Sequence, residues 1–147
     1  CDWSSDVCSS DLGDTMVPLP RYTTVAGIPV TELIESERLD AIVDRTKKGG
    51  GELVQLMGTS AWYAPGAAAA QMVETILRDE NRIFPCCVYL DGQYGQKDIF
   101  LGVPVKLGKE GIVDIIELPL NDEEKALLNA SSEHVRAVMD VFENMNV

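Results

Sequence analysis

The chain has 147 residues, of which 46% are hydrophobic and 24% are charged, and its formal net charge is -12. This balance is that of a globular protein with room for one hydrophobic core. The negative charge would repel nucleic acids and anionic membranes, so we expect neither as a partner, and no apolar run approaches the roughly 18 residues of a membrane span. No secretory signal is recognisable at the start, which favours a cytoplasmic protein.

Residues 1–12 have a different texture from the rest of the chain. The tetrapeptides Ser-Ser-Asp-Val and Ser-Ser-Asp-Leu stand on either side of Cys8 as near copies, without helical or strand periodicity. We predict that this head is disordered, and we hypothesise that it is not part of the native protein, because the repeat resembles a translated sequencing adapter. The folded domain is then predicted to cover residues 13–147.

The first elements of the folded part are predicted to be short. Strands are expected at residues 16–19 and 22–25, and a helical turn is expected at residues 31–36. A longer helix is predicted over residues 37–57, because apolar residues recur at helical spacing before and after the run Gly-Gly-Gly at residues 49–51. Each glycine costs a helix about 1 kcal/mol relative to alanine, so we expect a kink, bulge or break there.

The second half of the chain is predicted to alternate between helices and a sheet. The next helix has Pro65 in its first turn and extends to about residue 79. Three strands follow it, at residues 83–90, 99–107 and 111–118. Their connections are too short for crossover helices, so we expect antiparallel pairing. Asn121 is predicted to be the N-cap of a long terminal helix, with Glu124 completing a capping box. The chain is therefore predicted to be an α+β domain in which an antiparallel sheet packs against long helices.

The cysteine and histidine residues do not form a metal-binding pattern. Cys1 and Cys8 lack CxxC spacing and a neighbouring histidine. Cys86 and Cys87 are adjacent in an apolar strand, so we predict buried, reduced thiols. The single histidine, His134, lies midway along the terminal helix, where we predict a solvent-facing side chain. We therefore expect no metal ligand in this chain.

Four segments resemble one known family in order and spacing. Residues 13–18, Gly-Asp-Thr-Met-Val-Pro, resemble the segment directly after the active-site histidine of lactate and malate dehydrogenases, where the family pattern is Gly-x-His-Gly-Asp. Ala-Gly-Ile-Pro-Val at 26–30, Asp-Arg-Thr-Lys-Lys-Gly-Gly at 44–50 and Gly-Thr-Ser-Ala-Trp-Tyr-Ala-Pro at 58–65 follow in the expected places. The resemblance covers residues 13–147 and implies the C-terminal, substrate-binding domain of that family. The style of the last segment favours malate over lactate as the substrate.

The resemblance implies an enzyme that oxidises (S)-malate to oxaloacetate with NAD, a reaction of the tricarboxylic acid cycle. That chemistry needs a general base, usually histidine, arginines that hold the substrate carboxylates, and a Rossmann fold for the dinucleotide. The position that matches the catalytic histidine holds Leu12, and the chain contains no Gly-x-Gly-x-x-Gly motif. We therefore expect a truncated domain without catalytic residues, which lacks the N-terminal Rossmann half, binds no NAD alone and does not turn over malate.

The resemblance also assigns four residues around the substrate. Ser60 would present its hydroxyl to a substrate carboxylate, and a helix-capping role ahead of Pro65 is an equal alternative. Ala64 would line the nicotinamide pocket or serve only in packing. Gly13 and Asp14 would hold the catalytic loop, and a local turn-stabilising hydrogen bond is the alternative for Asp14.

Quaternary structure and the competing functions are also expectations at this stage. The helix predicted at residues 37–57 resembles the one that packs across a dimer interface in this family, so we expect a homodimer or homotetramer in the intact protein and an exposed apolar patch in this chain. Trp62 and Tyr63 are predicted to be core or interface aromatics. Two other interpretations stay open: a dehydrogenase of lactate or another 2-hydroxy acid, and a non-catalytic interaction module with the same fold.

Overall fold

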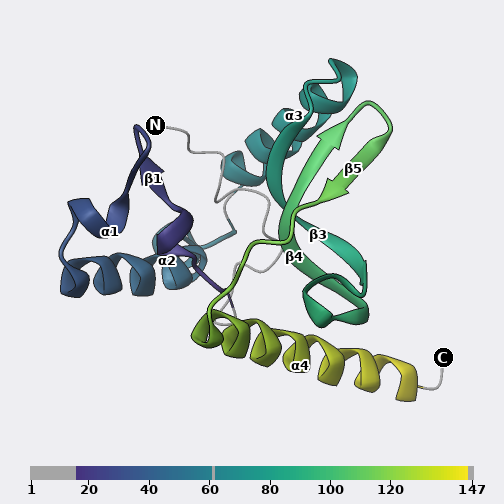
Figure 1. Ribbon diagram of the computed structural model, residues 1–147. Helices are drawn as coiled ribbons and strands as arrows, with labels where there is room; N and C mark the ends of the chain where they lie inside the picture. Colours follow the sequence, from purple (N-terminus) through teal and green to yellow (C-terminus); the bar gives the residue numbers. More distant parts are fainter. Residues whose placement is uncertain (1–15, 61, 146–147) are drawn as a thin grey trace. The chain divides into compact units, whose positions relative to one another are not determined.

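A computed structural model describes residues 16–60 and 62–145 of the chain (Figure 1). These residues divide into two compact units on either side of residue 61, and each unit is described by itself. The predicted head, with Leu12 at the position of the family histidine, lies outside the described residues, and so do Gly13 and Asp14. The boundary predicted between residues 12 and 13 therefore stays a prediction.

The first unit begins with short elements. They are the 3-10 helix η2 (Pro20–Tyr22), the paired strands β1 (Thr24–Val25) and β2 (Ile28–Pro29), and helix α1 (Val30–Leu33). The strand predicted at residues 16–19 is wrong, and only the last two residues of the second predicted strand are in β1. Proline has a fixed φ that suits the first turn of a helix, which explains why Pro20 begins η2 instead. The hairpin turns through Ala26 and Gly27, which both have positive φ.

Helix α2 (Ser36–Met57) is the long element of the first unit (Figure 1). It continues through all three glycines at residues 49–51, so the predicted break is wrong, while the predicted kink stays a prediction. Glycine costs a helix backbone entropy, about 3 kcal/mol for the three together, but it is sterically free to adopt helical angles. The helix ends at Gly58, which has a left-handed φ of 71° and donates its N–H to the Val54 carbonyl at 2.9 Å.

The second unit contains a sheet and two helices. The chain runs from α3 (Tyr63–Leu77) through β3 (Arg82–Asp91), β4 (Lys97–Gly108) and β5 (Gly111–Ile115) to α4 (Asp122–Asn144). The strands pair antiparallel in the order β3-β4-β5, as predicted. Strand β5 ends three residues earlier than predicted, because the Leu118 N–H is bound by the Tyr94 hydroxyl at 2.9 Å and not by a neighbouring strand.

The core of the second unit lies on one face of this sheet. Every second side chain of β3 and β4 is buried: Phe84, Cys86, Val88, Leu90, Ile99, Leu101, Val103, Val105 and Leu107. Leu128 of α4 joins this cluster, and Met72 of α3 with Val135 and Met139 of α4 packs against it. The predicted α+β architecture, an antiparallel sheet packed against long helices, is confirmed.

The two adjacent cysteines show how the alternation works. Cys86 is buried, as predicted, but Cys87 is exposed, so that half of the prediction is wrong. Successive side chains of a strand point to opposite faces of a sheet, and the described residues cover only one face of this sheet.

The start of α4 has the predicted capping box. The Asn121 side chain accepts a hydrogen bond from the Glu124 N–H at 2.8 Å, and the Glu124 carboxylate accepts one from the Asn121 N–H at 2.8 Å. His134 is exposed, as predicted. Farther along the helix the apolar residues Val138 and Phe142 are also exposed, so they lie outside the core, whereas Met139 packs against it.

Candidate functional site

Ser60, the predicted substrate-binding residue, lies two residues after the left-handed cap of α2. Its side chain is exposed. The N-cap of α3 is Trp62, without a side-chain capping bond, so the alternative in which Ser60 caps that helix is wrong. The Ser60 hydroxyl is therefore not used to start α3.

Ala64, the predicted pocket residue, is the second residue of α3, and Pro65 is in the first turn as predicted. Ala64 is exposed and belongs to the second unit, whereas Ser60 belongs to the first. Trp62 and Tyr63 are 69% and 86% exposed, so they are not core aromatics in this structure. Both indole and phenol are large apolar surfaces at the start of α3, as an interface would have.

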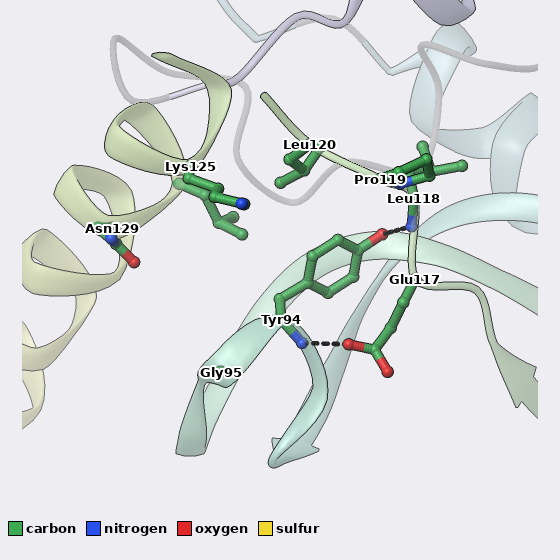
Figure 2. A pocket seen from close by; sticks show the side chains of 9 residues that line it. Tyr94, Gly95, Glu117, Leu118, Pro119, Leu120, Lys125 and Asn129 are labelled. Carbon is green, nitrogen blue, oxygen red and sulfur yellow. Dashed lines mark hydrogen bonds between the residues drawn. The ribbon is translucent and has the colours of Figure 1, made fainter. Parts of the chain in front are cut away.

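A hollow that the sequence did not indicate lies within the second unit (Figure 2). It has a volume of about 410 Å³, and its lining comes from the β3–β4 loop, the segment after β5 and the start of α4: Tyr94, Gly95, Glu117, Leu118, Pro119, Leu120, Lys125, Leu128 and Asn129. Most of these side chains are apolar. The contacts that build it join residues more than 20 positions apart, which no local sequence pattern reveals.

Tyr94 organises this hollow. Its backbone N–H donates to the Glu117 carboxylate at 2.6 Å, and its hydroxyl accepts the Leu118 N–H (Figure 2). The same hydroxyl donates to the Ile116 carbonyl at 2.7 Å. Tyr94 has a φ of 54°, so the loop holds it in the left-handed region. These bonds tie the loop after β3 to the segment after β5.

The polar groups around the hollow are already paired. The Gln96 amide donates to the Asn129 side-chain oxygen at 2.8 Å. The Lys125 ammonium lies 4.0 Å from the Asp122 carboxylate. No lining residue is a histidine, cysteine or serine, and the Glu117 carboxylate in the lining already accepts the Tyr94 N–H.

Two hydrogen-bonded pairs shift the pKa values of Arg45, Glu52 and Tyr89. The Glu52 carboxylate accepts two hydrogen bonds from Arg45, which lower the pKa of Glu52 and raise that of Arg45. The Tyr89 hydroxyl donates to Asp98 at 2.6 Å, and this bond raises the pKa of Tyr89 because it stabilises the neutral phenol. The first pair lies on α2, the helix that leads to Ser60.

The described residues do not form a Rossmann site for a dinucleotide. A Rossmann site needs parallel strands with a glycine-rich turn between strand and helix, and both sheets within residues 16–60 and 62–145 are antiparallel. The same residues contain no group of three His, Cys, Asp or Glu side chains placed to hold a metal ion. None of their helices combines the length and apolar character that a membrane crossing requires.

The chain is similar to known malate dehydrogenases. It is 65% identical over 133 residues to the malate dehydrogenase of Cytophaga hutchinsonii, a match that covers 90% of this chain and 43% of the relative. The solved malate dehydrogenase of Salinibacter ruber superposes with a TM-score of 0.89 at 59% identity, covering 90% of this chain and 44% of that one. The chain thus spans less than half the length of these relatives.

A lactate dehydrogenase is also among the similar structures. The enzyme of Eimeria maxima, solved with NADH and oxamate, superposes with a TM-score of 0.86 at 44% identity over 90% of this chain and 42% of that one. The sequence model of the lactate/malate dehydrogenase, alpha/beta C-terminal domain, matches residues 11–145. The chain belongs to the lactate/malate dehydrogenase family, as its alpha/beta C-terminal domain.

Proposed function

We propose that the protein to which this domain belongs is an NAD-dependent oxidoreductase that converts (S)-malate to oxaloacetate. The observation that carries the proposal is the 65% identity to a malate dehydrogenase over 133 residues. The 58–65 segment and the order of the other family-like segments support it. The enzyme would serve carboxylic acid metabolism in the tricarboxylic acid cycle and work in the cytoplasm.

The chain alone is proposed to be inactive. Oxidation of a hydroxyl group needs a base that takes its proton near neutral pH. The family position for that base holds Leu12, and the only histidine, His134, is an exposed residue of α4. The base, the arginines that clamp the carboxylates and the NAD-binding Rossmann fold would belong to an N-terminal half that this chain lacks.

The domain would supply one wall of the substrate site. The Ser60 hydroxyl would donate a hydrogen bond to a malate carboxylate, an interaction with a charged group that contributes about 1.5–3 kcal/mol. Ala64 would line the nicotinamide pocket, and Gly13 and Asp14 would hold the catalytic loop. The exposure of Ser60 and its absence from the α3 cap support its part in this arrangement.

The test is a chimera. Residues 13–147 of this chain replace the matching domain of the Cytophaga hutchinsonii malate dehydrogenase, and NADH formation from malate is followed by absorbance. We expect turnover by the chimera and none by the isolated chain. A folded chimera without turnover would favour the non-catalytic interaction module, and activity of the isolated chain above background would contradict our interpretation of Leu12.

Within this chimera, Ser60→Ala tests the proposed hydrogen bond. We expect KM for malate to rise about 10- to 100-fold, which corresponds to the loss of one bond to a charged group. Ser36→Ala is the matched control, because Ser36 is an exposed first residue of α2. Equal KM values for the two variants would contradict the proposal that Ser60 binds a malate carboxylate.

A second candidate is a lactate or other 2-hydroxy acid dehydrogenase. It is favoured by the match to the Eimeria maxima lactate dehydrogenase at 44% identity. An assay of the intact natural protein with malate and with lactate separates the two. A higher kcat/KM for lactate would replace the malate proposal.

The intact enzyme is further proposed to be a homodimer or homotetramer through α2. Large apolar side chains of this helix are exposed: Ile42, Leu53, Val54, Leu56 and Met57. We expect the isolated chain to self-associate in size-exclusion chromatography. A clean monomer that binds no apolar dye would argue against this interface.

A further inference from the structure

The three glycines of α2 stand in open space. A Cβ atom added at Gly49, Gly50 or Gly51 would meet no atom of the described residues within 4 Å. Packing among the described residues therefore does not explain the choice of glycine here. What distinguishes these positions from alanine is backbone freedom, so the middle of α2 is its intrinsically weakest part.

An ion pair reaches across this weak segment. Arg45 precedes the glycines by four residues, and Glu52 follows them directly. The two N···O distances are 3.2 Å from the Arg45 Nε and 3.0 Å from its terminal nitrogen, so the guanidinium grips both carboxylate oxygens. Residues seven apart lie about two turns apart on the same helix face. Ordinary helix pairs join residues three or four apart, so this pair spans the glycines over a longer stretch of the helix.

We propose that the glycine run is a latent hinge in α2 and that the Arg45–Glu52 pair is the splint that holds it straight. Bending away from the helix face that carries the pair lengthens the distance between the partners, so the pair resists bending in that direction. Both side chains are largely exposed, at 78% and 42%. Salt therefore screens the splint and loosens the hinge.

The hinge has a consequence for the substrate segment. The half of α2 after the glycines leads directly to Gly58 and Ser60, so opening the hinge redirects Ser60 relative to the first half of the helix. This last step rests on the proposed function, whereas the hinge itself does not. The pair would thus position Ser60 without contacting the substrate.

A matched control pair exists on α3. Arg78 and Glu74 are joined at 2.6 Å, four residues apart, with no glycine between them. Loss of this pair removes an exposed salt bridge from a helix without a hinge. It therefore separates the general effect of losing a helix ion pair from the effect proposed for α2.

The experiment is hydrogen–deuterium exchange on the 147-residue chain, with Glu52→Gln, Glu74→Gln and the double variant Glu52→Gln with Gly50→Ala. We expect Glu52→Gln to speed exchange of the amides at residues 49–55 about two- to fivefold. We expect 1 M NaCl to speed exchange of the same amides in the unaltered chain, but not in Glu52→Gln. Gly50→Ala should slow this exchange again about fivefold, and Glu74→Gln should leave α2 unchanged.

Three results would overturn the proposal. They are unchanged exchange at residues 49–55 in Glu52→Gln, an equal salt effect with and without Glu52, and a loss of protection in β3 and β4 together with α2, which would make the pair a general stabiliser. The measurement needs no enzyme activity. Failure of the malate proposal in the chimera would therefore leave the hinge standing, and failure of the hinge would leave the malate proposal standing.

Discussion

Neighbouring residues of β4 offer a direct test of the sheet's two faces. Ile99 is 0% exposed within the core, whereas Phe100 is 58% exposed on the opposite face. Removing most of a buried isoleucine costs its transfer free energy and leaves a cavity, about 3–4 kcal/mol in total. For Phe100→Ala the main loss is an edge-to-face contact with Tyr89, whose ring centroid lies 5.4 Å away, and this contributes about 0.5–1.5 kcal/mol.

The assay is urea unfolding followed by circular dichroism. Whole domains are stable by only about 5–15 kcal/mol, so Ile99→Ala should lower the urea midpoint strongly. In thermal unfolding the same variant should lower Tm by about 10 °C. Phe100→Ala should shift the urea midpoint little, with the same urea dependence of the free energy. Equal losses for the two variants would refute the assignment of a covered and an uncovered face.

Three further predictions concern the backbone cap and the two pKa shifts. Gly58→Ala forces a side chain into a left-handed φ of 71° and should cost about 1 kcal/mol in urea unfolding. Asp98→Asn should lower the pKa of Tyr89 toward its ordinary value, read as a shift in phenolate absorbance during alkaline titration, because the hydrogen bond to the carboxylate is weakened. Arg45→Gln should raise the pKa of Glu52 toward its ordinary value, read by carboxyl NMR. The sign of its stability effect is that of a depressed acid: the contribution is present above the unfolded pKa of about 4.3 and is lost as pH falls through the lower folded pKa.

Each of these predictions has an outcome that contradicts it. Unaltered stability of Gly58→Ala would mean that the chain turns elsewhere after α2. Asparagine at residue 98 can keep the positive φ of 54°. If the Tyr89 titration does not shift in Asp98→Asn, the hydrogen bond from Tyr89 to Asp98 does not raise the pKa of Tyr89. If the titration of Glu52 is unchanged in Arg45→Gln, the hydrogen bonds from Arg45 do not lower the pKa of Glu52.

Most of the structure of the second unit could be predicted from local sequence patterns. The alternation of apolar residues in β3 and β4 and the three-residue spacing of Asn121 and Glu124 each specify their structure within a few positions. The break predicted at the glycine run did not occur, because the free energy of a helix is summed over all of its residues and side-chain pairs. A segment of low helix propensity can therefore remain helical. Cys87 misled because apolar character alone does not say which face of a sheet is covered.

The candidate site was less accessible to sequence reasoning. Ser60 and Ala64 were assigned by resemblance, and the structure adds only that both are exposed and that Ser60 is not a cap. The hollow beside Tyr94 was missed, because its hydrogen bonds to residues 116–118 span 22 to 24 positions. Such contacts depend on the tertiary fold and leave no periodic trace.

The hairpin of β3 and β4 also has a bearing on the order in which the chain folds. Its pairs run from Leu90 with Ile99, near the loop, out to Arg82 with Leu107. Each successive pair closes only a short additional length of chain, so the conformational entropy of the chain is lost in small steps as the hairpin forms. Contacts between residues near in sequence form fast. This hairpin is therefore suited to be the nucleus on which α3 and α4 later condense.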